Sequence, residues 1–472
     1  MADLPAKAAS LKMKQFNGLN GCSVCYHPGE NYRCWVYPYK GDQRDRKYAE
    51  VWRDAHLAEV NGAEENGVKG KSVVLDIQRI PEEAPFDYMH LVLEGEWKRK
   101  LLLLLDPRNG YITKGELEQL DQSVKAIKFP HDFKERVTEV SLESIRKAKA
   151  SEQQLLILHI LFPLLKGVLD EELFVHLGLL VTANHILNQD SASDQDVKNA
   201  DTMLKTYHRL NEDLYNKSEM TYTNHALTHL AKQRKAHGCP LVLLSNFVFE
   251  GFIATLKRQY HGSTGVVSQM VRNVVVLQDL ERYAEAFRGG ALFEYVKEIL
   301  YGKQLKMNKL EDNTKVQGIV DTLEHDVPDD ISSFCNTNGA QYWQRMEVNS
   351  RMFHSLAYKR KGQSASYLAI INSNGKKLFG KILVFLSVHS FGFAMVQLFE
   401  KTQNRLFDNA YADENVAELV RENILGCGFI PLKLTKDIVL VRGAELSKRF
   451  LFVTNNEKTG FASEELYSYQ HD

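Results

Sequence analysis

The sequence predicts an α+β protein whose helices fill the first two thirds of the chain and whose strands lie near its end. Helical periodicity dominates residues 88–230, whereas short apolar runs separated by turn signals such as Asn374-Gly375 occupy residues 340–472. With 472 residues, 44% of them hydrophobic, the chain can form two or three domains with buried cores. A helical region followed by a small, mainly antiparallel β domain is therefore expected.

The first 86 residues are predicted to be the least regular part of the chain. A helix can begin after Asp3, which is a suitable N-cap, and it tolerates Pro5 in its first turn. The expected elements are a helix over 4–16, an irregular cysteine-bearing stretch over 17–38, a short helix over 50–60 and a strand over 72–77.

Residues 87–230 are predicted to form a helical domain. The stretch 151–165 is apolar on nearly every side, which is typical of a helix at the centre of a bundle. Helices are expected over 88–105, 142–148, 151–165, 171–187, 197–215, 222–232, 266–277 and 278–300, with one more around Glu250. The acidic, polar stretch 311–339 is predicted to be a linker. Strands are expected over 367–372, 380–387, 394–399, 438–441 and 449–454.

Charge and cysteine content narrow the class of protein. The net charge of -1 gives no global basic signature, so a nucleic-acid surface must be local. The chain starts without a secretory signal and has no run of about eighteen apolar residues, so no membrane partner is expected. Six cysteines in so long a chain do not form a disulfide scaffold, and the three that cluster suggest metal binding.

Cys22 and Cys25 have the spacing of zinc ligands, because two intervening residues let both thiolates reach one ion. A closed site needs two more ligands. The candidate pairs are His27 with Cys34, and His225 with His229. The first pair would complete a local site, whereas the second pair, four residues apart, would lie on one face of a helix. Buried free thiols and ordinary helix histidines are the simpler alternatives.

Carboxylates at two predicted helix starts allow two interpretations. Asp3 is a metal ligand or, more simply, an N-cap. Asp87 follows Pro85 and opens a long helix, so it can cap that helix, and His90, one turn later, can bond a carboxylate. Asp87 and His90 are therefore alternative metal ligands.

Glu250 is the most informative single residue, because it lies among phenylalanines and is followed by a basic stretch. On a helix it would share a face with Phe247 and Ile253, and burying an ionised carboxylate there is costly unless a metal or a base pairs with it. The alternative is a helix glutamate paired with a nearby lysine. The basic residues expected to flank a DNA path beside Glu250 are Lys232, Arg234, Lys235, Lys257 and Arg258.

The order of these motifs is more specific than any one of them. The series D-x-P-A-K-A, N-G-x-x-G-C-x-x-C, D-Y-M-H, H-x-x-x-H and F-E-G-F-I-A-T-L-K-R-Q-Y-H-G resembles the catalytic core of eukaryotic cut-and-paste transposases. The likeness is to the CACTA group, with hAT elements and the V(D)J recombinase catalytic subunit as more distant relatives. It spans roughly residues 3–275.

The resemblance implies a partial RNase H-like core, formed by residues 1–86 and 231–310 and interrupted by a helical insertion over 87–230. By this resemblance Asp3 and Glu250 are the second and third acids of an Asp-Asp-Glu triad. Such enzymes hydrolyse and transfer DNA strands with two Mg2+ or Mn2+ ions. The same resemblance implies a structural zinc ion, a nuclear protein and DNA as the partner, with a second copy of the chain as a further candidate partner. The implied zinc ligands are Cys22, Cys25, His225 and His229.

The chain departs from the family pattern at its start. The first aspartate should lie on a strand before Asp3, where only Met1 and Ala2 are present. We therefore expect an N-terminally truncated or domesticated, transposase-derived protein that binds DNA without catalytic activity. Two alternatives stay open: an active Mg2+-dependent recombinase completed by upstream sequence, and a zinc-stabilised scaffold that binds proteins through its C-terminal β domain.

Overall fold

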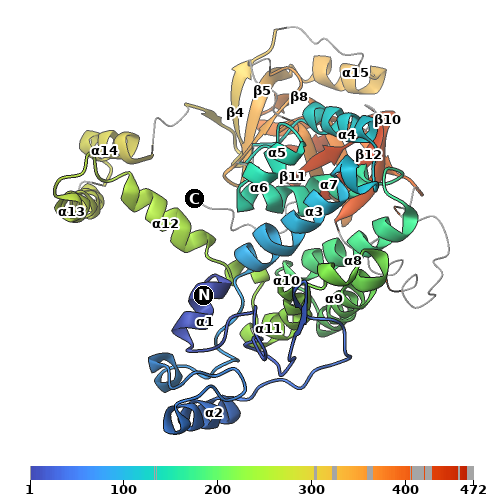
Figure 1. The fold of residues 1–472 in the computed structure, drawn as a ribbon. Coiled ribbons are helices and arrows are strands. Elements are labelled where there is room, and N and C mark those ends of the chain that lie inside the picture. Colours follow the sequence, from blue (N-terminus) through green and yellow to red (C-terminus); the bar gives the residue numbers. More distant parts are fainter. Residues whose placement is uncertain are drawn as a thin grey trace.

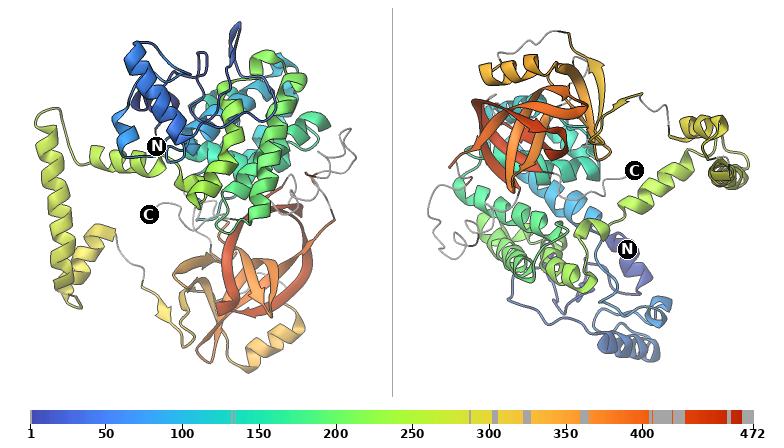
Figure 2. Two further views of the ribbon diagram at one scale, coloured as in Figure 1. Left: turned by 90° about the horizontal axis from the view of Figure 1, so that it is seen from below. Right: turned by 180° about the vertical axis from the view of Figure 1, so that it is seen from behind.

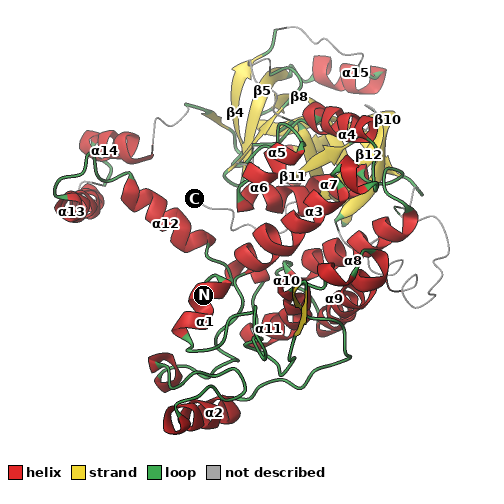
Figure 3. Cartoon of the chain, in the orientation of Figure 1, coloured by secondary structure: helices red, strands yellow, loops and turns green. Residues whose placement is uncertain are grey.

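The computed structural model describes residues 2–131, 133, 135–286, 288–301, 306–321, 327–358, 365–403, 406, 419, 428–454 and 458–464. Figure 1 shows a central helical body, with the N-terminal segment on one side and a strand-rich C-terminal part on the other. The helices α12 to α14 extend away from all three (Figures 1 and 2). The mixed α and β composition and the C-terminal position of the strands are confirmed (Figure 3).

The N-terminal segment contains little regular structure. Its elements are α1 (Leu4–Ser10), β1 (Glu30–Tyr32), β2 (Cys34–Val36), α2 (Tyr48–Asn61) and the 3-10 helix η1 (Val73–Asp76). The strand predicted over 72–77 is wrong, because the Ser72 hydroxyl caps a 3-10 turn in which Val73 is 81% exposed and only Leu75 is buried. In the described part of residues 2–301, the antiparallel hairpin β1–β2 is the only sheet.

The helical body is built around two almost completely buried segments. Residues 150–164 form α6 (Ala150–Leu155), η4 (Leu156–Ile160) and α7 (Leu161–Leu164), and α8 (Glu171–Leu187) is buried from Leu173 onward. The central position predicted for 151–165 is thus confirmed. Around them lie η2 (Met89–Trp97), α3 (Lys98–Leu104), η3 (Pro107–Asn109), α4 (Lys114–Ala126), α5 (Leu142–Lys147), α9 (Asp194–Leu214), η5 (Lys217–Glu219), α10 (Tyr222–Ala226), η6 (Leu227–His229), α11 (Leu230–His237) and η7 (Leu241–Leu243).

We call α12 (Phe247–Lys257), α13 (Val266–Ala286) and α14 (Ala291–Tyr301) the arm. No residue of α12 is buried, and several of its large apolar side chains are half-exposed or more. The boundary predicted at residue 277 is wrong, because α13 continues without a break to Ala286.

The C-terminal strands form one antiparallel sheet that closes on itself. The strands are β3 (Asn308–Lys309), β4 (Lys315–Ile319), β5 (Gln341–Val348), β6 (Arg351–His354), β7 (Leu368–Ser373), β8 (Lys376–Val388), β9 (Phe391–Lys401), β10 (Phe429–Arg442), β11 (Leu446–Val453) and β12 (Thr459–Glu464), with α15 (Asp329–Thr337) and η8 (Gly443–Glu445) between them. The order β8-β7-β11-β12-β10-β9 returns to β8 by a β8–β9 ladder. The predicted linker 311–339 contributes β4 to this sheet, where β4 pairs with β5.

One hydrophobic cluster joins the sheet to the helical body, and three further clusters lie within the β-rich region. Phe429 of β10 packs against Phe162 of α7 and His185 of α8, and the imidazole of His159 lies 2.8 Å from the Ser463 hydroxyl of β12. The β-rich region is therefore docked on the helices rather than tethered to them. No helix in the described part of the chain is long and apolar enough to cross a membrane.

Candidate metal centre

The loop that carries Cys22 and Cys25 is fixed by a buried arginine and by a glycine. Arg46 Nε donates to the carbonyls of Cys22 (2.9 Å) and Cys25 (3.1 Å), and the Arg46 amide donates to Val24 (2.8 Å). A Cβ atom at Gly21 would lie 2.3 Å from the Gln15 carbonyl oxygen, so only glycine fits before Cys22. Both thiols are consequently held on the inner side of the loop, where they are fully buried.

The two histidines come from a short helical turn on the opposite side of the centre. Thr221 caps α10 by accepting a hydrogen bond from the Asn224 amide, and His225 and His229 follow near the ends of α10 and η6. The Tyr37 ring stacks on the His225 ring, with centroids 5.3 Å apart and planes 14° apart. Both imidazoles are buried, so their orientation is set by packing.

The four ligand atoms converge on one point, and three of their separations fit a tetrahedral site. Cys25 Sγ lies 3.4 Å from His225 Nε2, Cys22 Sγ lies 3.6 Å from His229 Nε2, and the two Nε2 atoms are 3.4 Å apart. Bond lengths of about 2.3 Å to sulfur and about 2.0 Å to nitrogen place neighbouring ligands of a tetrahedral zinc ion about 3.3 to 3.8 Å apart. All four ligand atoms lie within 4.8 Å of one another. The cluster can therefore hold a metal ion, as predicted.

Charge at the two thiols also favours a cation. Burial opposes ionisation of Cys22, yet hydrogen bonding with Cys25 and the nearby His229 hold the pKa of the Cys22 thiol well below its ordinary value. Hydrogen bonding with Cys22, together with burial, raises the pKa of Cys25. A divalent ion bound by both thiolates would displace their protons.

The alternative ligands His27 and Cys34 lie outside this cluster. His27 Nε2 is 2.8 Å from the Pro38 carbonyl, and its Nδ1 accepts from the Gly29 amide at 3.0 Å, so both ring nitrogens are occupied. Burial lowers the pKa of His27 to about 4. Cys34 is exposed on β2. The structure therefore favours the distant histidine pair over a local site.

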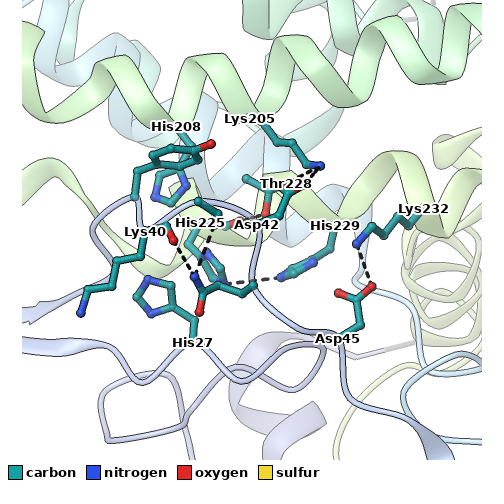
Figure 4. Close-up of a pocket in the computed structure, with 13 residues that line it drawn as sticks. His27, Lys40, Asp42, Asp45, Lys205, His208, His225, Thr228, His229 and Lys232 are labelled. Atoms are coloured by element: carbon teal, nitrogen blue, oxygen red, sulfur yellow. Dashed lines mark hydrogen bonds and ion pairs between the residues drawn. The ribbon is translucent and has the colours of Figure 1, made fainter.

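A solvent-facing pocket lies directly beside the centre (Figure 4). His225 and His229 form part of its wall, and ion pairs cross its rim. Lys205 Nζ lies 2.8 Å from Asp42, and Lys232 Nζ lies 2.7 Å from Asp45. Lys232, predicted to contact DNA, is thus paired with an acid in this structure.

Glu96 is a site residue that the sequence analysis missed. It is 1% exposed and accepts hydrogen bonds from Tyr207 (2.9 Å), Thr223 (2.9 Å) and Asn224 (3.1 Å). Thr223 and Asn224 immediately precede His225, so this carboxylate positions the turn that carries the histidines. The signal in the sequence is the pair Glu96 and Lys100, which are four residues apart and therefore lie on one face of a helix.

The structure places Asp3 at a helix start and Glu250 on an exposed helix face. Asp3 Oδ1 accepts from the Ala6 amide at 2.8 Å, so the N-cap interpretation is confirmed. The Glu250 side chain is 55% exposed, so the expected burial of this carboxylate on an apolar face is wrong, because no residue of α12 is buried. The N-terminal end of the chain nevertheless lies beside the first turns of α12 in every view (Figures 1 and 2).

Asp87 and His90 connect the helical body to the arm. Asp87 is buried, and its Oδ1 accepts from the amides of Met89 (3.1 Å) and Asn246 (2.9 Å), which agrees with the predicted capping role. Its Oδ2 is bonded to His90 Nδ1, and this bond holds the pKa of His90 above its ordinary value.

The remaining basic residues divide into two groups. Arg234 is buried and donates to the Gln189 carbonyl at 3.2 Å, so it does not face solvent in this structure. Lys235 lies 3.9 Å from Asp194. Lys257 and Arg258 are exposed at the end of α12 and form no ion pair with any acid that the structure describes.

No protein-family model, curated protein or solved structure matches this chain.

Proposed function

We propose that this chain is a transposase-derived, DNA-binding protein that keeps the metal-stabilised framework of a cut-and-paste transposase without a complete catalytic triad. The observation that carries the proposal is the meeting of two ligand pairs that lie 200 residues apart in the sequence. The resemblance implies this pairing across an inserted helical domain, and neither motif alone favours it over a local site. On this proposal the protein acts on DNA in the nucleus.

We assign the ion of the centre as zinc, because two thiolates and two imidazoles in a closed, buried tetrahedron form a typical structural zinc site. Purified protein should contain about one zinc per chain, and Cys22→Ser should lose it. Cys34→Ser is the matched control, since Cys34 is exposed and outside the cluster. Loss of zinc from Cys34→Ser and its retention in Cys22→Ser would contradict the assignment.

We further propose that α1 and the arm are remnants of an RNase H-like core. In support, the residues assigned to the second and third acids come from segments that lie side by side, although 247 positions separate Asp3 from Glu250 in the numbering. The described residues before the C-terminal strands contain no sheet beyond β1–β2, so this part of the proposal is supported only by the placement of α1 and α12.

DNA binding is tested by the salt dependence of affinity, because each phosphate contact releases counterions and adds about 0.9 to the slope on duplex DNA. Fluorescence anisotropy with a labelled duplex should show a clear slope for the wild type. Lys257→Glu with Arg258→Glu should reduce that slope by about two units. Lys114→Glu with Lys147→Glu, a double reversal at two exposed lysines of α4 and α5, should not.

Two results would overturn the DNA-binding proposal. One is a wild-type affinity that does not respond to salt, which would favour the protein-interaction scaffold. The other is an equal loss of affinity in both double variants, which would indicate a nonspecific effect of net charge.

A further inference from the structure

Two buried polar atoms beside the metal centre have no hydrogen-bond partner among the described residues. One is Nδ1 of His229, whose side chain is buried, and the other is Oδ1 of Asp45. His229 and Asp45 both line the solvent-facing pocket next to the centre (Figure 4). A nitrogen that can donate and an oxygen that can accept therefore border the same pocket.

The backbone and one ion pair fix the position of Asp45. An antiparallel β-bridge joins Asp45 to Cys25, which is a ligand of the centre. The Oδ2 atom of Asp45 lies 2.7 Å from Lys232 Nζ, and Lys232 follows His229 by three residues, so both lie on one side of the helical segment. Lys232 thus holds one carboxylate oxygen at the rim, while the other oxygen is buried beside the pocket.

A bound ion would fix the proton of the His229 ring. Nε2 of His229 faces the centre, 3.6 Å from Cys22 Sγ and 3.4 Å from His225 Nε2, so Nε2 is the nitrogen that would bind the ion. The ring proton then lies on Nδ1, where it needs an acceptor. Histidines that bind a metal usually donate this second N–H to a carboxylate, a backbone carbonyl or water, which orients the ring and raises its basicity.

We propose that Asp45 is the positioning carboxylate of the metal centre and accepts the Nδ1 proton of His229 through one water molecule. The two side chains form no direct hydrogen bond. The pocket between them, with a volume of about 30 Å³ for the centre of a water-sized sphere, has room for a bridging water. Lys232 acts through Asp45, because it orients the carboxylate. This inference rests on the zinc assignment made under the proposed function.

The experiment measures the zinc affinity of the full-length chain by competition with a chromogenic chelator. Asp45→Ala should weaken zinc binding by about 10- to 100-fold, which is the usual effect of removing an outer carboxylate of this kind. Asp45→Glu keeps a carboxylate at this position and should restore most of the affinity.

Asp42→Ala is the matched control. Asp42 lines the same pocket and lies 2.8 Å from Lys205 Nζ, so its loss removes the same charge and the same kind of ion pair. Its side chain is 71% exposed, and neither of its oxygens is a buried atom without a partner. The zinc affinity of Asp42→Ala should therefore equal that of the wild type.

A second measurement separates the hydrogen bond from a general effect on packing. In the zinc-loaded chain with isotopically labelled histidine, the Nδ1 proton of His229 should give a resolved NMR signal, because its hydrogen bond slows exchange with solvent. The signal should disappear in Asp45→Ala, whereas Asp45→Glu and Asp42→Ala should keep it.

Three results would overturn the role of Asp45. They are a zinc affinity of Asp45→Ala within about threefold of the wild type, persistence of the His229 Nδ1 signal in that variant, and an equal loss of affinity in Asp42→Ala. The last result would show that the affinity depends only on the net charge of the rim. A wild-type chain that binds no zinc would instead contradict the zinc assignment itself, and the role of Asp45 would fall with it.

Discussion

The Cys22 centre and the Glu250 region are both predicted from the sequence as places where a cation binds, and the structure builds them in opposite ways. At the centre, four buried ligand atoms converge from two segments and lie within 4.8 Å of one another. At Glu250, one exposed carboxylate faces one histidine across 3.7 Å. The first region is closed by a core, and the second is open to solvent.

This difference shows which sequence patterns determine the relative positions of ligand side chains. A pair of ligands two or four residues apart has its relative position set by the local backbone, so it can be predicted before the fold is known. A single glutamate among apolar residues carries no such constraint, since its environment depends on what packs against its helix. The cost of burying a carboxylate applies to Glu96, which is 1% exposed, rather than to Glu250.

The largest effect on stability is expected when the metal centre of Cys22, Cys25, His225 and His229 loses its ion. Cys22→Ser and His225→Ala should each release the ion and abolish cooperative unfolding of the helical body, because structural zinc contributes about 10 to 16 kcal/mol in small domains, as much as a typical domain's whole stability. Differential scanning calorimetry together with metal analysis checks this. His27→Gln alters a neighbouring imidazole that is not a ligand, and it should keep the ion. A cooperative transition in metal-free Cys22→Ser would show that the core folds without the centre.

The next effect separates the two glutamates directly. Glu96→Ala should destabilise the protein by about 3 to 5 kcal/mol, because it strands Lys100, whose ammonium is buried and 4.0 Å from the carboxylate. Glu250→Ala should change stability by less than about 0.5 kcal/mol. Urea denaturation measures both changes in the free energy of unfolding, on the condition that the wild type and the variants have the same denaturant slope m. Equal effects at the two positions would mean that the arm packs on the body in solution.

The sequence predicts the helical body and the β-rich end well, and the reasons can be seen in particular residues. The segments 150–164 and 171–187 are mostly apolar, so they are stable only when most of their length is buried. The short run 72–77 has the same composition as a strand, but it has no neighbouring strand to pair with and becomes a 3-10 turn. The docking of Phe429 on Phe162 was not predictable, because no local pattern encodes which surfaces meet.

A smaller effect is expected from acid. Burial, with the charge of Lys100, lowers the pKa of His176 to about 3, below the value of about 6.5 in an unfolded chain. The folded state therefore favours the neutral ring, and its contribution to stability is present above pH 6.5 and is lost as the pH falls from about 6.5 towards 3. His176→Gln should reduce the pH slope of the unfolding free energy by up to about 1.4 kcal/mol per unit in this window.

A histidine of the arm provides the control for the pH dependence of the unfolding free energy. His261 is exposed on the arm, so His261→Gln should leave the slope of the wild type unchanged. Protonation of the metal ligands contributes to the slope in every variant and cancels in the comparison. Equal slopes for His176→Gln and the wild type would contradict the prediction.

The smallest expected effect is no effect: the chain should not cut or join DNA with Mg2+ or Mn2+. A two-metal mechanism needs ligands that hold both ions against the attacking and leaving oxygens. Asp3 caps a seven-residue helix through the Ala6 amide, and Glu250 faces His90, so the described residues offer at most one ion a place at this end of the arm. A single ion held by two side chains cannot stabilise both oxygens at once.

Supercoiled plasmid incubated with either metal should be nicked no faster by the wild type than by Glu250→Ala. Nicking that this substitution abolishes would show that a further carboxylate completes the site, with Asp87 and Asp76 the first to replace.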